Sequence, residues 1–207
     1  MDAAPVDEHD PMAALRRALA RPAPPSTDFD LNPEVKLPPG RKLRPAAVLV
    51  AVQPARRDGR LEVILTKRSS RLAHHPGQVA FPGGKPEPCD DGLAETALRE
   101  AQEEVGLDPA SVEILGALPV HETVTGFTVA PFLARVHGRL DPVPEAGEVD
   151  EVFTVPLAHL VDPARYHVER RRWLGQWRRY YTVTWGPYYI WGATARILRA
   201  LAEQMRS

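Results

Sequence analysis

The chain has 207 residues, which fits one domain of ordinary size with an extension and excludes two large domains. Its composition, 43% hydrophobic and 26% charged, is typical of a globular protein and excludes a disordered chain or a fibre. The 26 Lys and Arg residues nearly balance 27 Asp and Glu residues, so the net charge of -1 provides no general attraction to nucleic acid or to an anionic membrane.

The single cysteine, Cys89, excludes an internal disulfide and a zinc site built from several cysteines, as expected in a reducing compartment. No apolar run approaches the ~20 residues of a membrane span. The acidic N-terminus MDAAPVDEHD lacks the basic and apolar regions of a signal peptide. We therefore expect a cytoplasmic protein with neither a membrane nor a nucleic acid as its partner.

Residues 1–40 are rich in proline and poor in large apolar side chains, apart from a helical pattern over 12–20. We predict that they form an N-terminal extension, partly disordered or acting as a docking arm, before a domain over 41–207. Short β-branched runs then predict strands over 46–52, 61–66, 112–118, 127–136, 152–155 and 179–185. Helical patterns predict helices over 93–105 and 192–205 and a shorter one over 156–161. Together these elements indicate an α+β fold, an α/β/α sandwich with a mixed β-sheet between helices.

Three glutamates share one side of the predicted helix over 93–105. At ~100° per residue, Glu103 and Glu104 fall within ~60° of Glu100, and small apolar residues form a separate stripe suited to packing on a sheet. Carboxylates four residues apart repel, and ligand sets made only of oxygen suit Mg²⁺ or Mn²⁺ rather than structural zinc. We predict that these glutamates bind such a cation and that Arg99 holds Glu103 by an ion pair. If the helix is considered alone, a solvated acidic face explains these charges better than a metal site does.

The residues before this helix favour a metal site over a solvated acidic face. The segment 83–107, GGKPEPCDDGLAETALREAQEEVGL, resembles the signature of the Nudix hydrolases, which runs glycine, five residues, glutamate, seven residues, then Arg-Glu-apolar-x-Glu-Glu-x-Gly-apolar. Its second half matches at each fixed position, with Ala101 at the apolar site. Its first half departs, because Asp90 stands at the glutamate position and eight residues separate it from Arg99. The acid that partners Arg99 is therefore Asp90, Asp91 or Glu95.

A second motif precedes the first. Residues 65–85, LTKRSSRLAHHPGQVAFPGGK, are similar to the segment before the signature in the coenzyme A pyrophosphatase branch of that family. The later segments EVDEVFTVPLAHL and YYIWGATARIL resemble the same branch, so the resemblance spans residues 45–204. It implies hydrolysis of the pyrophosphate bond of coenzyme A or an acyl-CoA, giving 3',5'-ADP and a 4'-phosphopantetheine compound.

The resemblance and the charges together give a candidate site. The expected catalytic residues are Arg99, Glu100, Glu103 and Glu104, with Mg²⁺ or Mn²⁺ held by Gly84, Glu100, Glu103, Glu104 and Glu148. The expected substrate-binding residues are Arg68, Ser69, Arg71, His75 and Gln78, because a basic loop suits the phosphates of a nucleotide. The segment Phe81-Pro82-Gly83-Gly84 ends a predicted strand, so the backbone carbonyl of Gly84 can turn toward a metal. An ordinary turn would explain the same four residues. Either the acid helix or a carboxylate of the loop with Glu145, Glu148 and Glu151 supplies the base, and we favour the helix.

Other assignments stay open. A hydrolase of ADP-ribose, NADH or a nucleoside triphosphate would use the same helix. A binding or regulatory module without turnover has no need of three repelling acids, which argues against it. The Trp and Tyr residues over 173–191 are expected in the core and at an interface, which leaves a homodimer open. A small nucleotide, coenzyme A or an acyl-CoA, is the expected partner.

Overall fold

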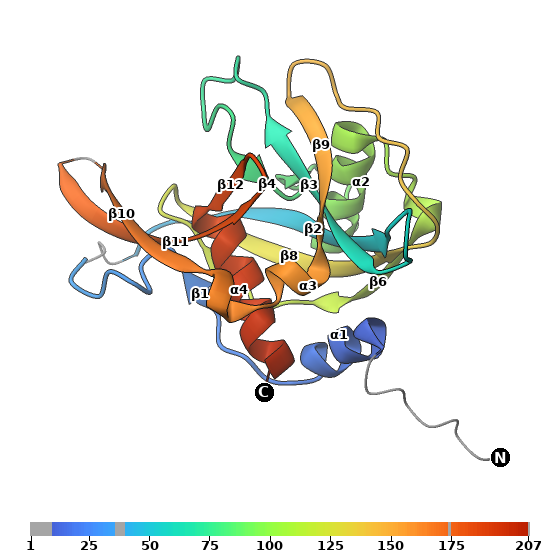
Figure 1. The fold of residues 1–207 in the computed structure, drawn as a ribbon. Helices are drawn as coiled ribbons and strands as arrows, with labels where there is room; N and C mark the ends of the chain where they lie inside the picture. The colour runs from blue at the N-terminus through green and yellow to red at the C-terminus, as the bar shows by residue number, and fades with distance from the viewer. Residues whose placement is uncertain (1–9, 36–39, 174, 207) are drawn as a thin grey trace.

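The computed structural model describes residues 10–35, 40–173 and 175–206 of the chain (Figure 1). A nine-stranded sheet forms its centre. The longest strands are β2 (Arg44–Pro54) and β8 (Phe127–Val136), which run parallel to each other. The strands β3 (Leu61–Arg68) and β6 (Val112–Ala117) flank this pair, and β9 (Val149–Pro156) lies beyond β3, all in antiparallel pairing. The short strands are β1 (Ser26–Thr27), β4 (Val79–Ala80), β5 (Gly83–Gly84) and β7 (His121–Glu122).

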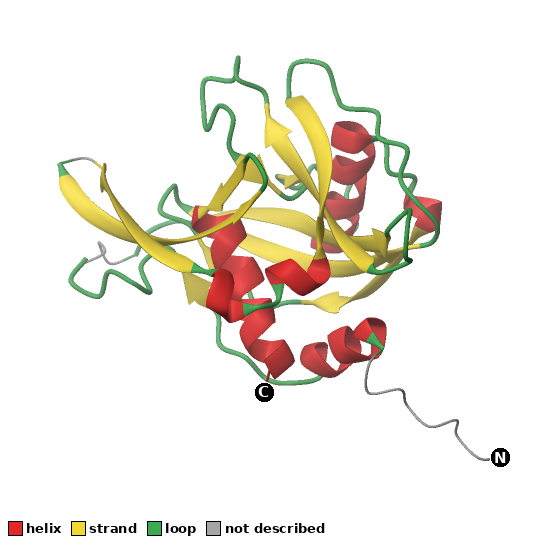
Figure 2. Ribbon diagram, in the orientation of Figure 1, coloured by secondary structure: helices red, strands yellow, loops and turns green. Residues whose placement is uncertain are grey.

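Helices cover both faces of this sheet (Figure 2). On one face lies α2 (Leu93–Val105), and on the other lie α1 (Pro11–Leu19), the short α3 (Leu157–Leu160) and α4 (Gly192–Arg206). Two short 3-10 turns, Pro109–Ser111 and Pro163–Arg165, follow α2 and α3. The predicted α+β fold with a mixed sheet between helices is confirmed.

The alternation of side chains along β2 explains these layers. Because successive strand residues point to opposite faces, Leu49 packs in the cluster beneath α2 while Val50 packs in the cluster with α4. On α2, the predicted small-residue stripe contributes Ala97 and Ala101, both fully buried, so the helix lies close to the sheet. Gly106, in a left-handed conformation with φ of 73°, ends the helix.

A second, three-stranded sheet is antiparallel and consists of β10 (His167–Trp173), β11 (Gln176–Trp185) and β12 (Tyr188–Trp191). The patterns predicted β11 only in part, over 179–185, and predicted neither β10 nor β12. The outer part of the β10–β11 hairpin extends away from the central sheet (Figure 1). The three-stranded sheet joins the core through Val183 on β11 and Ile190 on β12, which are fully buried.

Described residues of the proline-rich N-terminal segment pack against the domain. Leu15 and Ala18 on α1 are fully buried in the core that α4 also lines. β1 pairs with β7 in parallel, and the side chain of Asn32 bonds to the backbone of Arg179 through both of its polar atoms. Residues 1–9 and 36–39 of the predicted extension lie outside the described residues. No helix in the described part of the chain has the length and apolarity to span a membrane.

Candidate active site

The two glycines of β5 bring the backbone directly against the acid helix. β5 pairs with β2, with Gly83 opposite Val48 and Gly84 opposite Ala47. A Cβ atom added to Gly84 would lie 2.3 Å from Oε1 of Glu100, and one added to Gly83 would lie 2.3 Å from the carbonyl oxygen of Ala47. Gly83 is therefore required by the sheet, whereas a larger residue at Gly84 would displace the carboxylate of Glu100.

Glu104 is a buried carboxylate, with 4% of its surface exposed. Its Oε2 accepts a hydrogen bond of 3.2 Å from the amide of Gly83, and its Oε1 lies 4.0 Å from Nη1 of Arg68. Burial raises the pKa of Glu104 to about 7, although the Gly83 amide and Arg68 act in the opposite direction. A group that is half ionised near neutral pH can hold a cation or exchange a proton.

Glu100 and Glu148 complete a cluster of negative charge around Glu104. Burial raises the pKa of Glu100, while Arg99, with its Nη2 atom 3.2 Å from the Glu100 carboxylate, lowers it. The negative charge of Glu148 raises the pKa of both other glutamates, so it lies within electrostatic reach of each. A hydrogen bond of 2.8 Å from the amide of Ser69 to the Glu148 carbonyl fixes the backbone of Glu148 beside β3.

Glu103 lies at the edge of this cluster, where its negative charge also raises the pKa of Glu100. Its side chain is 52% exposed and forms the predicted ion pair with Arg99, at 2.9 Å. In the described part of the chain, no group of three or more His, Cys, Asp or Glu side chains is already arranged as a metal centre. The donor chemistry of Glu100, Glu104 and Glu148 nevertheless fits a hard divalent cation, because all three supply oxygen donors and the charges of Glu100 and Glu148 both raise the pKa of the buried Glu104. A place for Glu103 and for the Gly84 carbonyl among the ligands stays a prediction.

Asp90 is the acid that pairs with Arg99. Its Oδ1 atom lies 3.0 Å from Nε of Arg99, and its Oδ2 atom accepts a hydrogen bond of 2.8 Å from the hydroxyl of Thr96. The bonds from Arg99 hold the pKa of Asp90 well below its usual range. The other two candidates bond to each other, since the amide of Asp91 donates to the Glu95 carboxylate. Asp90 therefore takes the place of the first glutamate of the signature despite the longer spacing.

The predicted substrate-binding residues lie on the loop between β3 and β4. Backbone hydrogen bonds between Arg68 and both Gly77 and Gln78 close this loop beside Glu104. His75 has a φ of 55°, and burial together with the charge of Arg68 lowers its pKa, so its imidazole is neutral at neutral pH. Ser69 is buried, and its Oγ atom accepts a hydrogen bond from the amide of Arg71. The structure therefore places Ser69 where it supports the loop, and its contact with substrate stays a prediction.

One of the aromatic residues expected in the core also forms a polar contact, which the sequence patterns did not predict. Tyr188 stacks on Phe153 with the ring centroids 3.6 Å apart, and its hydroxyl donates a hydrogen bond to Glu151. Glu151 is thus bonded to Tyr188. Of the other two loop acids considered from the sequence, Glu145 donates its amide to the carbonyl of Glu104 at 3.0 Å. Glu148 is the one whose carboxylate charge raises the pKa of Glu100 and Glu104.

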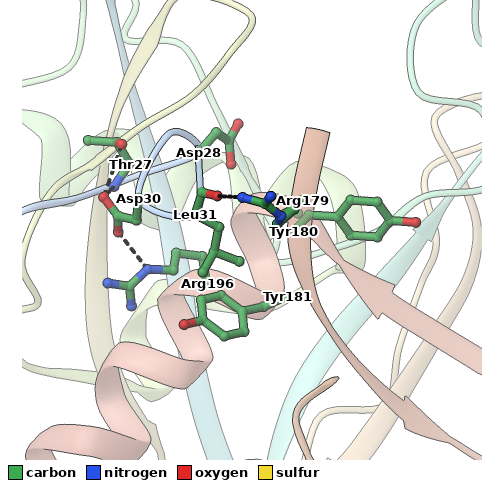
Figure 3. A pocket seen from close by; sticks show the side chains of 9 residues that line it. Thr27, Asp28, Asp30, Leu31, Arg179, Tyr180, Tyr181 and Arg196 are labelled. Carbon is green, nitrogen blue, oxygen red and sulfur yellow. Dashed lines mark hydrogen bonds and ion pairs between the residues drawn. The ribbon is translucent and has the colours of Figure 1, made fainter. Parts of the chain in front are cut away.

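A separate hollow lies between the N-terminal segment, β11 and α4 (Figure 3). Asp30 and Arg196 close one side of it with an ion pair of 2.8 Å, and Arg179 donates to the carbonyl of Leu31 at 3.2 Å. Its volume of about 20 Å³ holds one water molecule and no nucleotide. This hollow is therefore not the site of a nucleotide.

Known proteins resemble this chain over most of its length. The NUDIX domain family matches residues 42–177. The Nudix hydrolase NudL of Citrobacter koseri, described as uncharacterized, is 43% identical over 165 residues, which cover 78% of this chain and 83% of NudL. NudL of Salmonella paratyphi B is 42% identical over the same shares.

Solved structures are more distantly similar. RenU, a Nudix hydrolase from M. smegmatis, is 24% identical with a TM-score of 0.48, over 57% of this chain and 74% of RenU. The NUDIX domain of Shewanella oneidensis NrtR, solved with ADP ribose, is 21% identical with a TM-score of 0.45, over 61% of this chain and 78% of that one. The domain match and the identity to NudL carry the assignment: the chain belongs to the Nudix hydrolase family.

Proposed function

We propose that this hydrolase of nucleoside diphosphate derivatives cleaves the pyrophosphate bond of coenzyme A or an acyl-CoA. The products would be 3',5'-ADP and 4'-phosphopantetheine or its acyl form. One observation carries the proposal: Arg68, within the motif over 65–85 that resembles the coenzyme A branch, lies 4.0 Å from Glu104 of the acid helix. The loop expected to bind the nucleotide and the helix expected to catalyse hydrolysis thus adjoin each other.

Glu100, Glu104 and Glu148 would hold Mg²⁺ or Mn²⁺, the cations that Nudix hydrolases generally use. When bound, the cation would neutralise the diphosphate and activate water for attack on phosphorus. Arg99 orients the helix carboxylates by bonding to Glu100 and Glu103. The contribution of this chain is therefore to place the negative charge that binds the cation and to keep it in one geometry.

The β3–β4 loop would determine substrate choice. The guanidinium groups of Arg68 and Arg71 can each form charge-assisted hydrogen bonds to phosphate, and the neutral imidazole of His75 can donate one more. We assign to this loop the 3'-phosphate that distinguishes coenzyme A from dephospho-CoA. A lost bond of this kind costs roughly 1.5–3 kcal/mol, or about ten- to a hundredfold in specificity.

The test is a substrate panel assayed with Mg²⁺ and with Mn²⁺: coenzyme A, an acyl-CoA, dephospho-CoA, ADP-ribose, NADH and a nucleoside triphosphate. We expect coenzyme A or the acyl-CoA to have the highest kcat/KM and dephospho-CoA a value about ten- to a hundredfold lower. Arg71→Ala and Arg68→Ala should narrow this gap, and Arg165→Ala, another exposed arginine, should leave it unchanged. Equal rates for the two coenzyme A forms, or a preference for ADP-ribose, would point to another nucleoside diphosphate derivative as substrate. Binding of all compounds without turnover would indicate a regulator.

A further inference from the structure

The β10–β11 hairpin concentrates positive charge. Five of its residues are arginines and one is a glutamate. The register places Arg170 directly opposite Arg179 and Arg171 directly opposite Arg178. Like charges at directly opposed positions destabilise a strand pair, so this hairpin has an excess of positive charge that its own fold does not compensate.

Carboxylates elsewhere in the described chain do not neutralise four of these five arginines. Among the described residues, Arg170, Arg172, Arg178 and Arg179 form no ion pair with a carboxylate. Two guanidinium nitrogens of Arg178 are buried without a hydrogen-bond partner in that same part of the structure. The hairpin's one carboxylate, Glu169, accepts a hydrogen bond from the hydroxyl of Tyr189. Charges on an edge strand also prevent aggregation, but that does not explain the two arginines of β11, the inner strand.

Apolar side chains accompany these charges on one face of the hairpin. Val168 and Trp177 are 51% and 56% exposed, and the register puts both on the face that carries Arg170 and Arg172. Exposed aromatic residues with arginine are typical of protein interfaces. The face therefore has the chemistry of a docking surface for an acidic partner with an apolar centre.

The same chain carries a surface of that description. Residues 141–148 are all exposed and contain Asp141, Glu145 and Glu148 without any Lys or Arg. Val143 in their midst is 68% exposed, more than any other large apolar residue of the described chain. This acidic loop leads into β9 beside α2, whereas the hairpin extends on the opposite side of the molecule, so the two surfaces do not meet within one chain (Figure 1).

We infer that the chain forms a two-fold dimer in which the β10–β11 hairpin of each copy docks on the 141–148 loop of the other. Trp177 and Val168 would contact Val143, and Arg170 and Arg172, which share their face, would lie opposite Asp141 and Glu145. Two reciprocal contacts close such a dimer, whereas hairpin against hairpin would bring like charges together. The inference concerns assembly and does not rest on the proposed function.

Charge reversal tests both surfaces by sedimentation velocity. The wild type should be a dimer at about 0.15 M NaCl and dissociate more readily at about 0.5 M, because salt screens exposed charges. Arg170→Glu/Arg172→Glu, and separately Asp141→Arg/Glu145→Arg, should raise the dimer dissociation constant roughly tenfold or more. The hairpin variant should fold, since the carboxylate introduced at position 170 would face Arg179. Arg17→Glu/Arg206→Glu, which reverses two exposed charges on α1 and α4, should leave the dimer intact.

Mixing the two interface variants gives the decisive result. Each variant alone should be monomeric, and an equimolar mixture should form a heterodimer, because the reversed hairpin then meets the reversed loop. A monomeric wild type at ~100 μM, a loop variant that stays dimeric, or a mixture that stays monomeric overturns the inference. Binding of a single-stranded RNA or of anionic vesicles by a monomeric wild type, lost in the hairpin variant, would overturn it in favour of another occupant.

Discussion

Both carboxylate oxygens of Asp90 face the guanidinium group of Arg99, at 3.0 Å from Nε and 3.2 Å from Nη2. The hydroxyl of Thr96 fixes Asp90 from the other side. Arg99 in turn bonds to Glu100 and Glu103. The loop before α2 thus controls the position of the helix carboxylates through one arginine.

We predict that Asp90→Asn lowers kcat about tenfold or more, the usual effect of losing a residue that orients metal ligands. It should also lower the free energy of unfolding, because the Asp90 side chain, only 2% exposed, would no longer neutralise Arg99. Kinetics and urea unfolding measure the two effects. Asp91→Asn, the same chemical change at an exposed neighbour, is the control. If the Asp91 variant lost as much activity, Asp90 would not be the residue that orients Arg99.

The two glycines of β5 should respond differently to alanine. In Gly84→Ala the new Cβ meets the flexible end of Glu100, which can move, so we expect a folded protein with little turnover. In Gly83→Ala it meets the backbone oxygen of Ala47, which the sheet holds in place, so we expect a large loss of stability. Thermal unfolding and turnover of both variants test this. Full activity in Gly84→Ala would mean that the position of the Glu100 carboxylate is unimportant.

The pKa of Glu104 predicts how stability depends on pH without metal. A carboxyl raised to about 7 in the folded state stays protonated while its unfolded counterpart, near 4.5, ionises. The contribution of this group to the free energy of unfolding is therefore at its maximum below pH 4.5. It decreases as the pH rises toward 7, by about 3 kcal/mol at most. His75 acts in the opposite sense because its pKa is lowered. The difference in unfolding free energy between wild type and Glu104→Gln isolates the first effect.

In EDTA, the wild type should lose stability relative to Glu104→Gln between pH 5 and pH 8. Mg²⁺ or Mn²⁺ should stabilise the wild type more at pH 8 than at pH 5, because the cation competes with a proton for Glu104. It should stabilise the variant less at either pH. A stability difference that does not change with pH would show that Glu104 is ionised throughout, contrary to the effect of its burial.

Helical periodicity was sufficient to predict α2, whose bounds, Leu93–Val105, are those expected from the sequence. It grouped Glu104 with the other acids on an arc separate from the apolar stripe, and did not predict that Glu104 is buried. It could not show that Glu103 turns toward Arg99 and solvent, because a wheel gives angles around the axis but not the position of the sheet. Nor could it identify Asp90, which lies in a loop where helical spacing does not apply.

The strand β10 was missed for a related reason. Its sequence, HVERRRW, has no alternation of apolar and polar residues, so no local pattern indicates a strand. Seven register pairs with β11 hold it in place. The packing of the N-terminal segment was not predicted for the same reason. The sequence around Asn32 indicates only a loop, whereas in the structure its side-chain amide bonds to the backbone of Arg179 on β11. Contacts between residues distant in sequence decide both cases.

The last prediction concerns the base that activates water. Glu104 is held by the packing of α2, whereas Glu148 sits at the end of an exposed loop. A base with fixed geometry is the more effective one, so we assign the role to Glu104. Glu148→Gln should lower kcat modestly and keep the acidic limb of the pH profile.

Glu104→Gln should instead lower kcat by ~100-fold or more and remove that limb, since the group that must lose a proton is gone. Stopped assays of both variants from pH 5 to 9 at saturating Mg²⁺ make the comparison, and metal titrations followed by thermal unfolding separate binding from catalysis. If Glu148→Gln abolishes turnover while its metal affinity matches that of the wild type, the loop carries the base. In that case the role of Glu104 is to hold the cation.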